Sequence, residues 1–303
     1  MRMSDEEAHA KFEAIRFAAN DGSPYCPHCG VTKVYTLAET PVRWKCSACR
    51  KKFSVTSGTV FASRKLPIRE YLAAIALFVN GVKGISSLQL SRDLDINPKS
   101  AFVMLHKLRE AMEAEQRGVT LSGTVEIDGA FFIRRPPQAN KIADRPDRRS
   151  IEERDPSRRQ VVVIARERNG RTITMVGNRE SDGVPMFRSR IAIGSTIHAD
   201  EARGWDSLHA RYEMNRVNHS VEFMSEAGAS INWAESYFSR LRRAEFGVHH
   251  RISGRLLGRY ASEMAWREDH RRIANGEQLN AVAAIALAHP KSEWAGYWHR
   301  SDK

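Results

Sequence analysis

The pattern of hydrophobic and polar positions changes character near the middle of the chain. In the first half, apolar residues recur every three or four positions, as in the stretch "PIREYLAAIALFVNGV" that begins at Pro67. That spacing predicts amphipathic helices. After Gly123, short runs rich in valine and isoleucine are separated by turn residues, which predicts strands. The pattern therefore predicts a helical N-terminal half followed by a mixed α/β half.

Two helices on either side of a tight turn are predicted in the helical half. The first runs from Ser86 to Leu94 and the second from Pro98 to Met112. This arrangement suggests a helix-turn-helix whose second helix contacts DNA. The alternative is an ordinary helical bundle that packs the same apolar faces. On the first interpretation, the DNA contacts of the second helix come from Lys99, Lys107 and Arg109.

The order of elements in the second half is strand, hairpin, helix, strand, helix, strand, helix. The first strand is Thr124–Phe132, and Asn169-Gly170 is the predicted turn of the hairpin. This order is compatible with an RNase H-like core, in which three antiparallel strands are followed by parallel additions. Between the first strand and the hairpin, the arginine-rich segment 134–160 is expected to be a loop or an extended arm.

The cysteines fall in two CxxC pairs separated by 16 residues, and they are Cys26, Cys29, Cys46 and Cys49. This spacing is typical of a zinc ribbon, in which four thiolates surround one structural Zn²⁺. The alternatives are two disulfides or a redox pair. His28 lies inside the first pair, but four thiolates already complete a tetrahedral shell.

The charge indicates a polyanionic partner. The chain has 303 residues and a net charge of +12, an excess that favours nucleic acid. A basic protein with no such partner is the alternative. No apolar run approaches the length of a membrane span, so we expect no membrane association and a cytoplasmic location.

Three carboxylates stand where the predicted elements could bring them together. Asp128 lies inside the strand "GTVEIDGAFF", Asp200 ends the strand "STIHAD", and Glu235 lies on the helix Trp233–Phe246. Such a set could hold two Mg²⁺ or Mn²⁺ ions for phosphoryl transfer. The alternatives for Asp200 and Glu235 are helix capping and surface solvation.

Two further features of this half have open interpretations. Glu126 shares a strand face with Asp128 and could replace it, or it could form a salt bridge at the start of the strand. On the sequence alone, Glu126→Gln is expected to retain substantial activity. The basic residues on the helix after Trp233 could contact phosphate or form a solvated face; they are Arg240, Arg242 and Arg243.

Several blocks in the same order resemble the DDE transposases of bacterial insertion sequences, in the ISXO-like group with an N-terminal zinc ribbon. They include "CPHCG", "WKCSACRKKFSVTSGTVF", "VEIDGAFF", "IHADEARGWDSL", "INWAESYFSRLRR" and "HHRISGRLLGRYASEMAWR". The resemblance extends from about Cys26 to Arg272. Relatives often read phenylalanine-arginine-tyrosine-asparagine in the tail, where this chain has "WREDHRR", a departure that concerns the tail and not the carboxylates.

The resemblance implies that Asp128, Asp200 and Glu235 are the catalytic carboxylates, with 34 residues between the last two. It implies Mg²⁺-dependent cleavage at the ends of an insertion sequence, followed by attack of the freed 3′-hydroxyl on target DNA. The resemblance also implies that no covalent protein–DNA intermediate forms and that the protein acts as a homo-oligomer on DNA. The alternatives are a DNA-binding regulator whose transposase-derived core is inert, or a nuclease that acts on free nucleic acid.

Together these features predict a multi-domain chain. The expected parts are a helical lead-in at 1–22, a zinc ribbon at 23–62, a helix-turn-helix domain at 63–118, an RNase H-like DDE catalytic domain at 119–272, and a C-terminal tail at 273–303.

Overall fold

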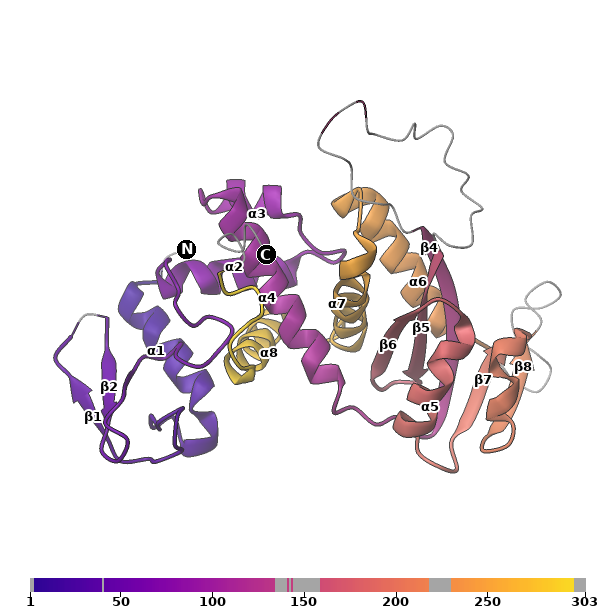
Figure 1. The fold of residues 1–303 in the computed structure, drawn as a ribbon, viewed down its shortest axis with the longest axis horizontal. Coiled ribbons are helices and arrows are strands. Elements are labelled where there is room, and N and C mark those ends of the chain that lie inside the picture. Colours follow the sequence, from indigo (N-terminus) through magenta and orange to yellow (C-terminus); the bar gives the residue numbers. More distant parts are fainter. Residues whose placement is uncertain are drawn as a thin grey trace. The chain divides into compact units, whose positions relative to one another are not determined.

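The chain forms two compact units (Figure 1). The structure, a computed structural model, describes residues 3–39, 41–133, 141, 143, 159–217 and 230–296. The helical unit comprises Met1–Glu115 and Arg272–Lys303, and the sheet unit comprises Gln116–Arg271. Most of the arginine-rich segment 134–160 lies outside the described residues.

The helical unit begins with α1 (Asp5–Arg16) and a three-stranded antiparallel sheet. Ser4 and Glu7 form a capping box at the start of α1, which satisfies two otherwise unpaired N–H groups. The strands are β1 (Val34–Leu37), β2 (Arg43–Cys46) and β3 (Lys52–Phe53), in the order β1-β2-β3. Trp44 of β2 is buried against Phe17 and Phe53, so the lead-in and the ribbon share one aromatic cluster.

Both helices of the predicted helix-turn-helix are present as helices. The helices of this part are α2 (Ile68–Asn80), α3 (Ser87–Asp93), α4 (Pro98–Gln116) and α8 (Asn275–Ala288). Asp95, with φ of 49°, makes the turn between α3 and α4. The C-terminal segment is not a separate tail, because α8 packs against α1 and α2. Asn275 Nδ2 also donates a 2.8 Å hydrogen bond to Asn80 Oδ1.

The sheet unit has the strand order predicted for an RNase H-like core. Its strands are β4 (Thr124–Ile133), β5 (Arg159–Glu167), β6 (Thr172–Gly177), β7 (Thr196–Asp200) and β8 (Glu213–Val217). The order across the sheet is β6-β5-β4-β7-β8. The pairs of β5 with β4 and β6 are antiparallel, and those of β7 with β4 and β8 are parallel. The predicted hairpin turn holds Asn169 at a φ of 62°.

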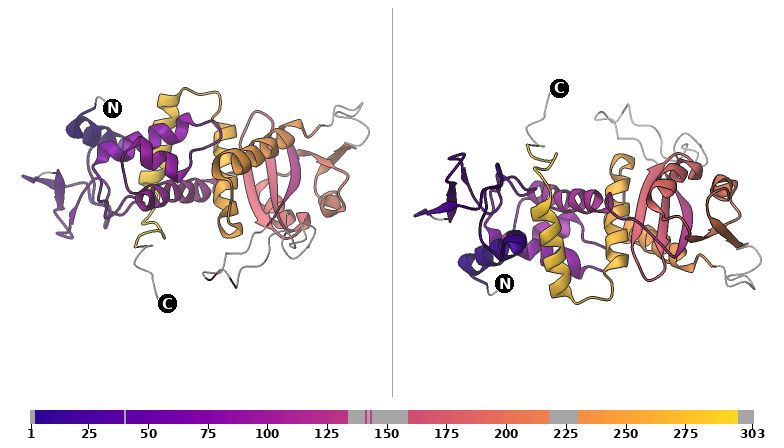
Figure 2. Two further views of the ribbon diagram at one scale, coloured as in Figure 1. Left: turned by 90° about the horizontal axis from the view of Figure 1, so that it is seen from above. Right: turned by 90° about the horizontal axis from the view of Figure 1, so that it is seen from below.

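Helices cover both faces of this sheet, as Figure 2 shows for the orange α6 lying across the strands. The helices are α5 (Val184–Arg190), α6 (Asn232–Ala244) and α7 (Leu257–Asp269). Odd-numbered β4 residues such as Val125 and Ile127 pack towards α5, together with Trp205 of the 3₁₀ turn η5 (Arg203–Leu208). That turn occupies part of a stretch that the sequence predicted as an ordinary helix.

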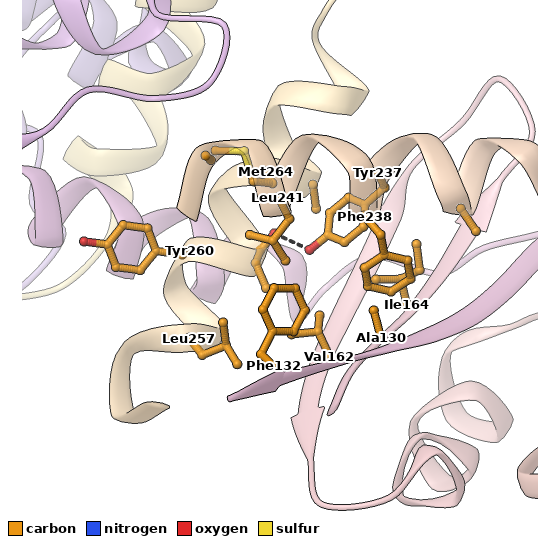
Figure 3. Packing of buried hydrophobic residues seen from close by; sticks show 14 of the residues in the cluster. Ala130, Phe132, Val162, Ile164, Tyr237, Phe238, Leu241, Leu257, Tyr260 and Met264 are labelled. Atoms are coloured by element: carbon orange, nitrogen blue, oxygen red, sulfur yellow. Dashed lines mark hydrogen bonds between the residues drawn. The ribbon is translucent and has the colours of Figure 1, made fainter. Parts of the chain in front are cut away.

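The opposite face packs against α6 and α7 through even-numbered residues of β4 and β5. Ala130, Phe132 and Val162 meet Phe238 and Leu241 there (Figure 3). The Tyr237 hydroxyl donates a 3.0 Å hydrogen bond to the Ala261 carbonyl, which ties α6 to α7. Asp128 and Asp200, two of the predicted site residues, lie on this same face of the sheet.

None of the helices among the described residues is long and apolar enough to cross a membrane.

Candidate active site and metal centre

The four cysteines converge in the ribbon, with all their ligand atoms within 4.8 Å of one another. The Sγ atoms of Cys26 and Cys49 lie 3.6 Å apart, and those of Cys29 and Cys46 lie 3.5 Å apart. Tetrahedral zinc with Zn–S bonds of about 2.3 Å requires sulfur atoms roughly 3.8 Å apart. All four cysteines are free, so neither disulfide of the alternative interpretation is present. The cluster is consistent with a structural zinc site.

Backbone hydrogen bonds support the thiolates that such a site needs. The N–H groups of Ala48 and Cys49 point at the sulfur of Cys46, and those of His28 and Cys29 point at Cys26. Both CxxC turns therefore present hydrogen-bond donors to their own first cysteine. Donors aimed at sulfur favour the charged thiolate over the thiol. The side chain of His28 is exposed and is not part of the cluster.

The second site lies on the α6 face of the larger sheet. Asp128 is the fifth residue of β4, and Asp200 is the last residue of β7, which pairs with β4 in parallel. Glu126 pairs with His198 in that register, and side chains two positions apart share a face. Asp128 and Asp200 each follow this pair by two residues, so the sheet presents them side by side.

Asp128 occupies a half-buried position among other carboxylates. Burial, together with the negative charges of Asp200, Glu180 and Glu235, raises the pKa of Asp128 to about 7. A 2.7 Å hydrogen bond from the Gly129 N–H to Asp128 Oδ1 acts in the opposite direction. Repulsion among these groups shows that their charges are concentrated at one place, as expected for a site that takes cations.

Asp200 is oriented by its own loop. The buried indole of Trp205 donates a 2.8 Å hydrogen bond to Asp200 Oδ1, and the Ala202 N–H donates a 3.2 Å bond to the same oxygen. Both bonds involve Oδ1, which fixes the orientation of the carboxylate plane.

Glu235 is exposed on the first turn of α6 and lines a pocket of about 400 Å³ with Asp128. Arg242 and Arg243, both exposed, line the same pocket from farther along α6. The lining of the pocket therefore combines two carboxylates with two guanidinium groups. A phosphodiester and divalent cations fit such a combination, since cations bind carboxylates and phosphate binds arginine.

Glu180 is a fourth carboxylate of this site, and the sequence analysis missed it. It opens the 3₁₀ turn Glu180–Gly183, and burial and the charge of Asp200 raise its pKa. A Cβ atom at Gly129 would lie 2.8 Å from its Cγ atom, and one at Gly204 would lie 3.1 Å from its Cβ atom. The glycine directly after Asp128 was the available signal, because glycine inside a strand often marks a close approach.

The carboxylates are more widely spaced than the cysteines. Among the described residues, the cysteines form the one group of three or more potential metal ligands that lie within 4.8 Å of one another.

The basic residues predicted to bind DNA have different environments. Lys99 is exposed near the start of α4, whereas Lys107 and Arg109 are only 8% and 1% exposed. Arg109 lies over the ring of Phe78, with 6.0 Å from its guanidinium carbon to the ring centroid. Lys107 and Arg109 are therefore buried, whereas the sequence interpretation requires side chains that DNA can reach. Arg240 forms an ion pair with buried Glu268.

Comparison with solved structures finds weak similarity to Mos1 transposase complexes. The Mos1 paired-end complex with the left transposon end matches with a TM-score of 0.21 and 11% identity, covering 75% of this chain and 82% of that one. A pre-cleavage Mos1 transpososome matches with a TM-score of 0.18 and 10% identity, covering 73% and 80%. Similarity at this level carries no argument about the fold.

Comparison with curated proteins finds a relative of nearly the same length. It is an uncharacterized protein in the transposable element ISH50 of Halobacterium salinarum. The two are 24% identical over 278 residues, which covers 87% of this chain and 91% of the relative.

Two protein-family models match the chain, and one covers the cysteine site while the other covers the carboxylate site. A model of the transposase zinc-ribbon domain matches residues 3–52, which include all four cysteines. A model of the ISXO2-like transposase domain matches residues 120–269, which include Asp128, Asp200 and Glu235. The chain thus belongs to the ISXO2-like family of DDE transposases with an N-terminal zinc ribbon.

Proposed function

We propose that this protein binds the ends of an insertion sequence and catalyses metal-dependent DNA cleavage and strand transfer. The observation that carries the proposal is the placement of Asp128, Asp200 and Glu235. They come from β4, β7 and α6, and their charges act on one half-buried position in the domain that matches the family. An inert core would not need to retain three repelling carboxylates at one place.

The wide spacing of the carboxylates supports a site shared between two ions. Two Mg²⁺ or Mn²⁺ ions, held by Asp128, Asp200 and Glu235, would stabilise the attacking and leaving oxygens of an in-line phosphoryl displacement. Ions about 3.5–4 Å apart need ligands on both sides, which carboxylates from three separate elements could provide. Glu180 adds negative charge beside Asp128 and Asp200.

The chain's own side chains position the reactants. Arg242 and Arg243 line the same pocket as Asp128 and Glu235, where they would hold the phosphates that flank the reacting bond. Asp128 must lose its proton to bind a cation, so the protonated fraction below pH 7 opposes metal binding.

The protein supplies no nucleophile: water attacks in the first step, and the freed 3′-hydroxyl attacks in the second.

The zinc ribbon and α3–α4 are the parts we assign to recognition of the DNA ends. The exposed basic residue that supports this assignment on α4 is Lys99. Joining two ends requires both to be held in one complex, so we also propose that the protein assembles as a homo-oligomer on DNA.

A plasmid assay tests this function. Supercoiled plasmids with and without a matched pair of element ends are incubated with the protein in Mg²⁺, and nicked, linear and joined products are counted. Cleavage confined to plasmids with ends supports transposition. Equal cleavage of both plasmids would identify a nuclease, and end-specific binding without cleavage would identify a DNA-binding regulator.

A further inference from the structure

Glu126 lies two residues before Asp128 and has no exposed surface. Its Oε2 atom accepts hydrogen bonds from the N–H groups of Trp233 at 2.8 Å and Ala234 at 3.1 Å. These groups belong to the first turn of α6, which receives no side-chain cap from Ile231, the residue before it. A carboxylate from β4 therefore caps the helix that carries Glu235.

Arg168 completes the surroundings of Glu126. Its Nε atom donates a 3.0 Å hydrogen bond to Glu126 Oε1, so both oxygens of the buried carboxylate are satisfied. The Nη2 atom of Arg168 lies 3.1 Å from His198 Nδ1 and donates to Ser230 Oγ at 2.9 Å. A buried carboxylate without such partners would be strongly destabilising.

His198 extends this network to the third element of the site. The Ser230 N–H donates a 3.2 Å hydrogen bond to His198 Nδ1, which makes that nitrogen an acceptor and places the imidazole proton on Nε2. Burial lowers the pKa of His198, and the charge of Arg168 lowers it further, which favours this neutral form. One connected network thus joins β4, β7 and the start of α6.

Each part of the network lies next to one carboxylate of the site. Glu126 precedes Asp128 by two residues on β4, and His198 precedes Asp200 by two residues on β7. Trp233 and Ala234 directly precede Glu235 on α6. A shift of any one element would therefore move its carboxylate relative to the other two.

We propose that Glu126 is a positioning residue, which holds α6, and with it Glu235, in register with Asp128 and Asp200. The expected effect on catalysis rests on the proposed function. The hydrogen bonds from Trp233 and Ala234 to Glu126, which we call the clamp on α6, are a property of the fold. The negative charge is part of the clamp, because helix N-termini bind carboxylates through free N–H groups and the helix dipole.

The sequence alone suggested that Glu126→Gln retains substantial activity, and the structure argues against that. The glutamine oxygen could still accept from both N–H groups of α6, as Glu126 Oε2 does, but the amide nitrogen would then face the donating Nε of Arg168 and the negative charge at the helix N-terminus would be lost. Loss of groups that orient metal ligands typically costs about 10–100-fold in metal affinity or activity.

Asp269 provides a matched control in the same unit. Its side chain is buried, forms a 3.0 Å ion pair with Arg171, and accepts a 3.1 Å hydrogen bond from the Thr172 N–H. It joins the end of α7 to the start of β6, an edge strand that does not carry a carboxylate of the site. Asp269→Asn therefore changes a buried carboxylate of the same unit without removing a hydrogen bond to the first turn of α6.

The experiment compares Glu126→Gln, Asp269→Asn and the milder Arg168→Lys in the full-length protein. The measurements are amide hydrogen exchange of α6, calorimetric Mn²⁺ binding without DNA, DNA affinity, and the cleavage rate at saturating DNA. For Glu126→Gln we expect faster exchange at Trp233 and Ala234, at least tenfold weaker Mn²⁺ binding, a slower rate and unchanged DNA affinity. Arg168→Lys should change the same quantities less, and added Mn²⁺ should restore part of the rate.

The outcomes separate this inference from the proposed function. If Glu126→Gln behaves like Asp269→Asn in exchange, Mn²⁺ binding and rate, the positioning role is wrong. If α6 exchanges faster in Glu126→Gln but the wild-type protein binds no Mn²⁺, the role of Glu126 in holding α6 stands and the proposed function is wrong.

Discussion

At the scale of single residues, the central feature is a carboxylate that the surrounding protein disfavours in its charged form. Asp128 is half-buried and is surrounded by the charges of Asp200, Glu180 and Glu235. Glu126, on the same strand face, has the opposite situation, because an arginine and two backbone N–H groups hold it. Two acidic residues on one strand therefore have different roles: one is available to a cation, and the other is already satisfied.

We expect Asp128→Asn to stabilise the metal-free protein at alkaline pH. The pKa of Asp128 rises from 3.8 to about 7 on folding, so between these values the folded state binds more protons than the unfolded state. The free energy of unfolding of the wild type therefore falls as pH rises through this window, and the penalty is complete above pH 7. Thermal melts in buffer without added Mg²⁺ or Mn²⁺ should show the variant more stable at pH 8 and little different at pH 4. Equal stability of the two proteins at pH 8 would contradict the charge repulsion inferred here.

Sequence reasoning proposed Asp128 and Asp200 as site residues but did not indicate the residues that contact them or their neighbours. Asp128 and Asp200 could be predicted because each stands out in or at the end of an apolar strand. Glu180 and Arg168 reach the site and its network from a 3₁₀ turn and a hairpin turn, and no local pattern signals either contact. Such contacts depend on how strands are ordered in the sheet, and periodicity does not contain that information.

At the scale of elements, local patterns predicted most helices and strands well. Helices α2, α3 and α4 follow the apolar periodicity, and the hairpin follows its Asn169-Gly170 turn. The burial of Lys107 and Arg109 was not predictable, because residues far along the chain pack on α4. Glu110 of α4, for example, accepts a 3.0 Å hydrogen bond from the Glu293 N–H.

The ribbon is the element whose stability should depend most on a metal. Cys46→Ser removes one of four ligands, and small metal domains draw their folding free energy from the ion. We expect the wild type to contain one zinc per chain and the variant to lose both zinc and protection of residues 23–60 from proteolysis. Metal analysis that finds no zinc in freshly purified wild type would overturn this assignment.

For α4, we expect Lys99→Ala to weaken DNA binding by a similar factor for all sequences. Removal of a single phosphate contact should lower the slope of log affinity against log salt by about one. Binding titrations at several salt concentrations measure this slope. An unchanged slope would show that α4 does not contact phosphate through Lys99.

At the scale of the whole molecule, the helical unit contains both ends of the chain, and the sheet unit lies between them in the sequence. Residues from Arg272 onward belong to the helical unit, where α8 packs against α1 and α2. The sequence predicted a separate tail, because the apolar face of α8 does not reveal which helices cover it. The positive charge of +12 and the two matching family domains agree with a protein that acts on DNA.

Removal of residues 272–303 should destabilise the helical unit and leave the sheet unit folded. The truncation exposes the faces of α1 and α2 that α8 covers, and buried apolar area is worth about 25 cal/mol per Å². Hydrogen exchange followed by mass spectrometry should show faster exchange in α1 and α2 but not in β4 and β5. Equal loss of protection in both units would mean that they do not unfold independently.

The most direct test of the central claim is strand transfer by Asp128→Asn. A pre-cleaved end oligonucleotide with a free 3′-hydroxyl is offered to supercoiled target DNA in Mg²⁺, and joined products are measured beside end binding. The substitution keeps the shape of the side chain and removes the charge that holds the cations. We predict that the variant binds ends as well as wild type and joins at least 100-fold more slowly, since each 1.36 kcal/mol of lost transition-state stabilisation costs about tenfold in rate. Joining by Asp128→Asn at the wild-type rate would contradict the assignment of this carboxylate to the catalytic site.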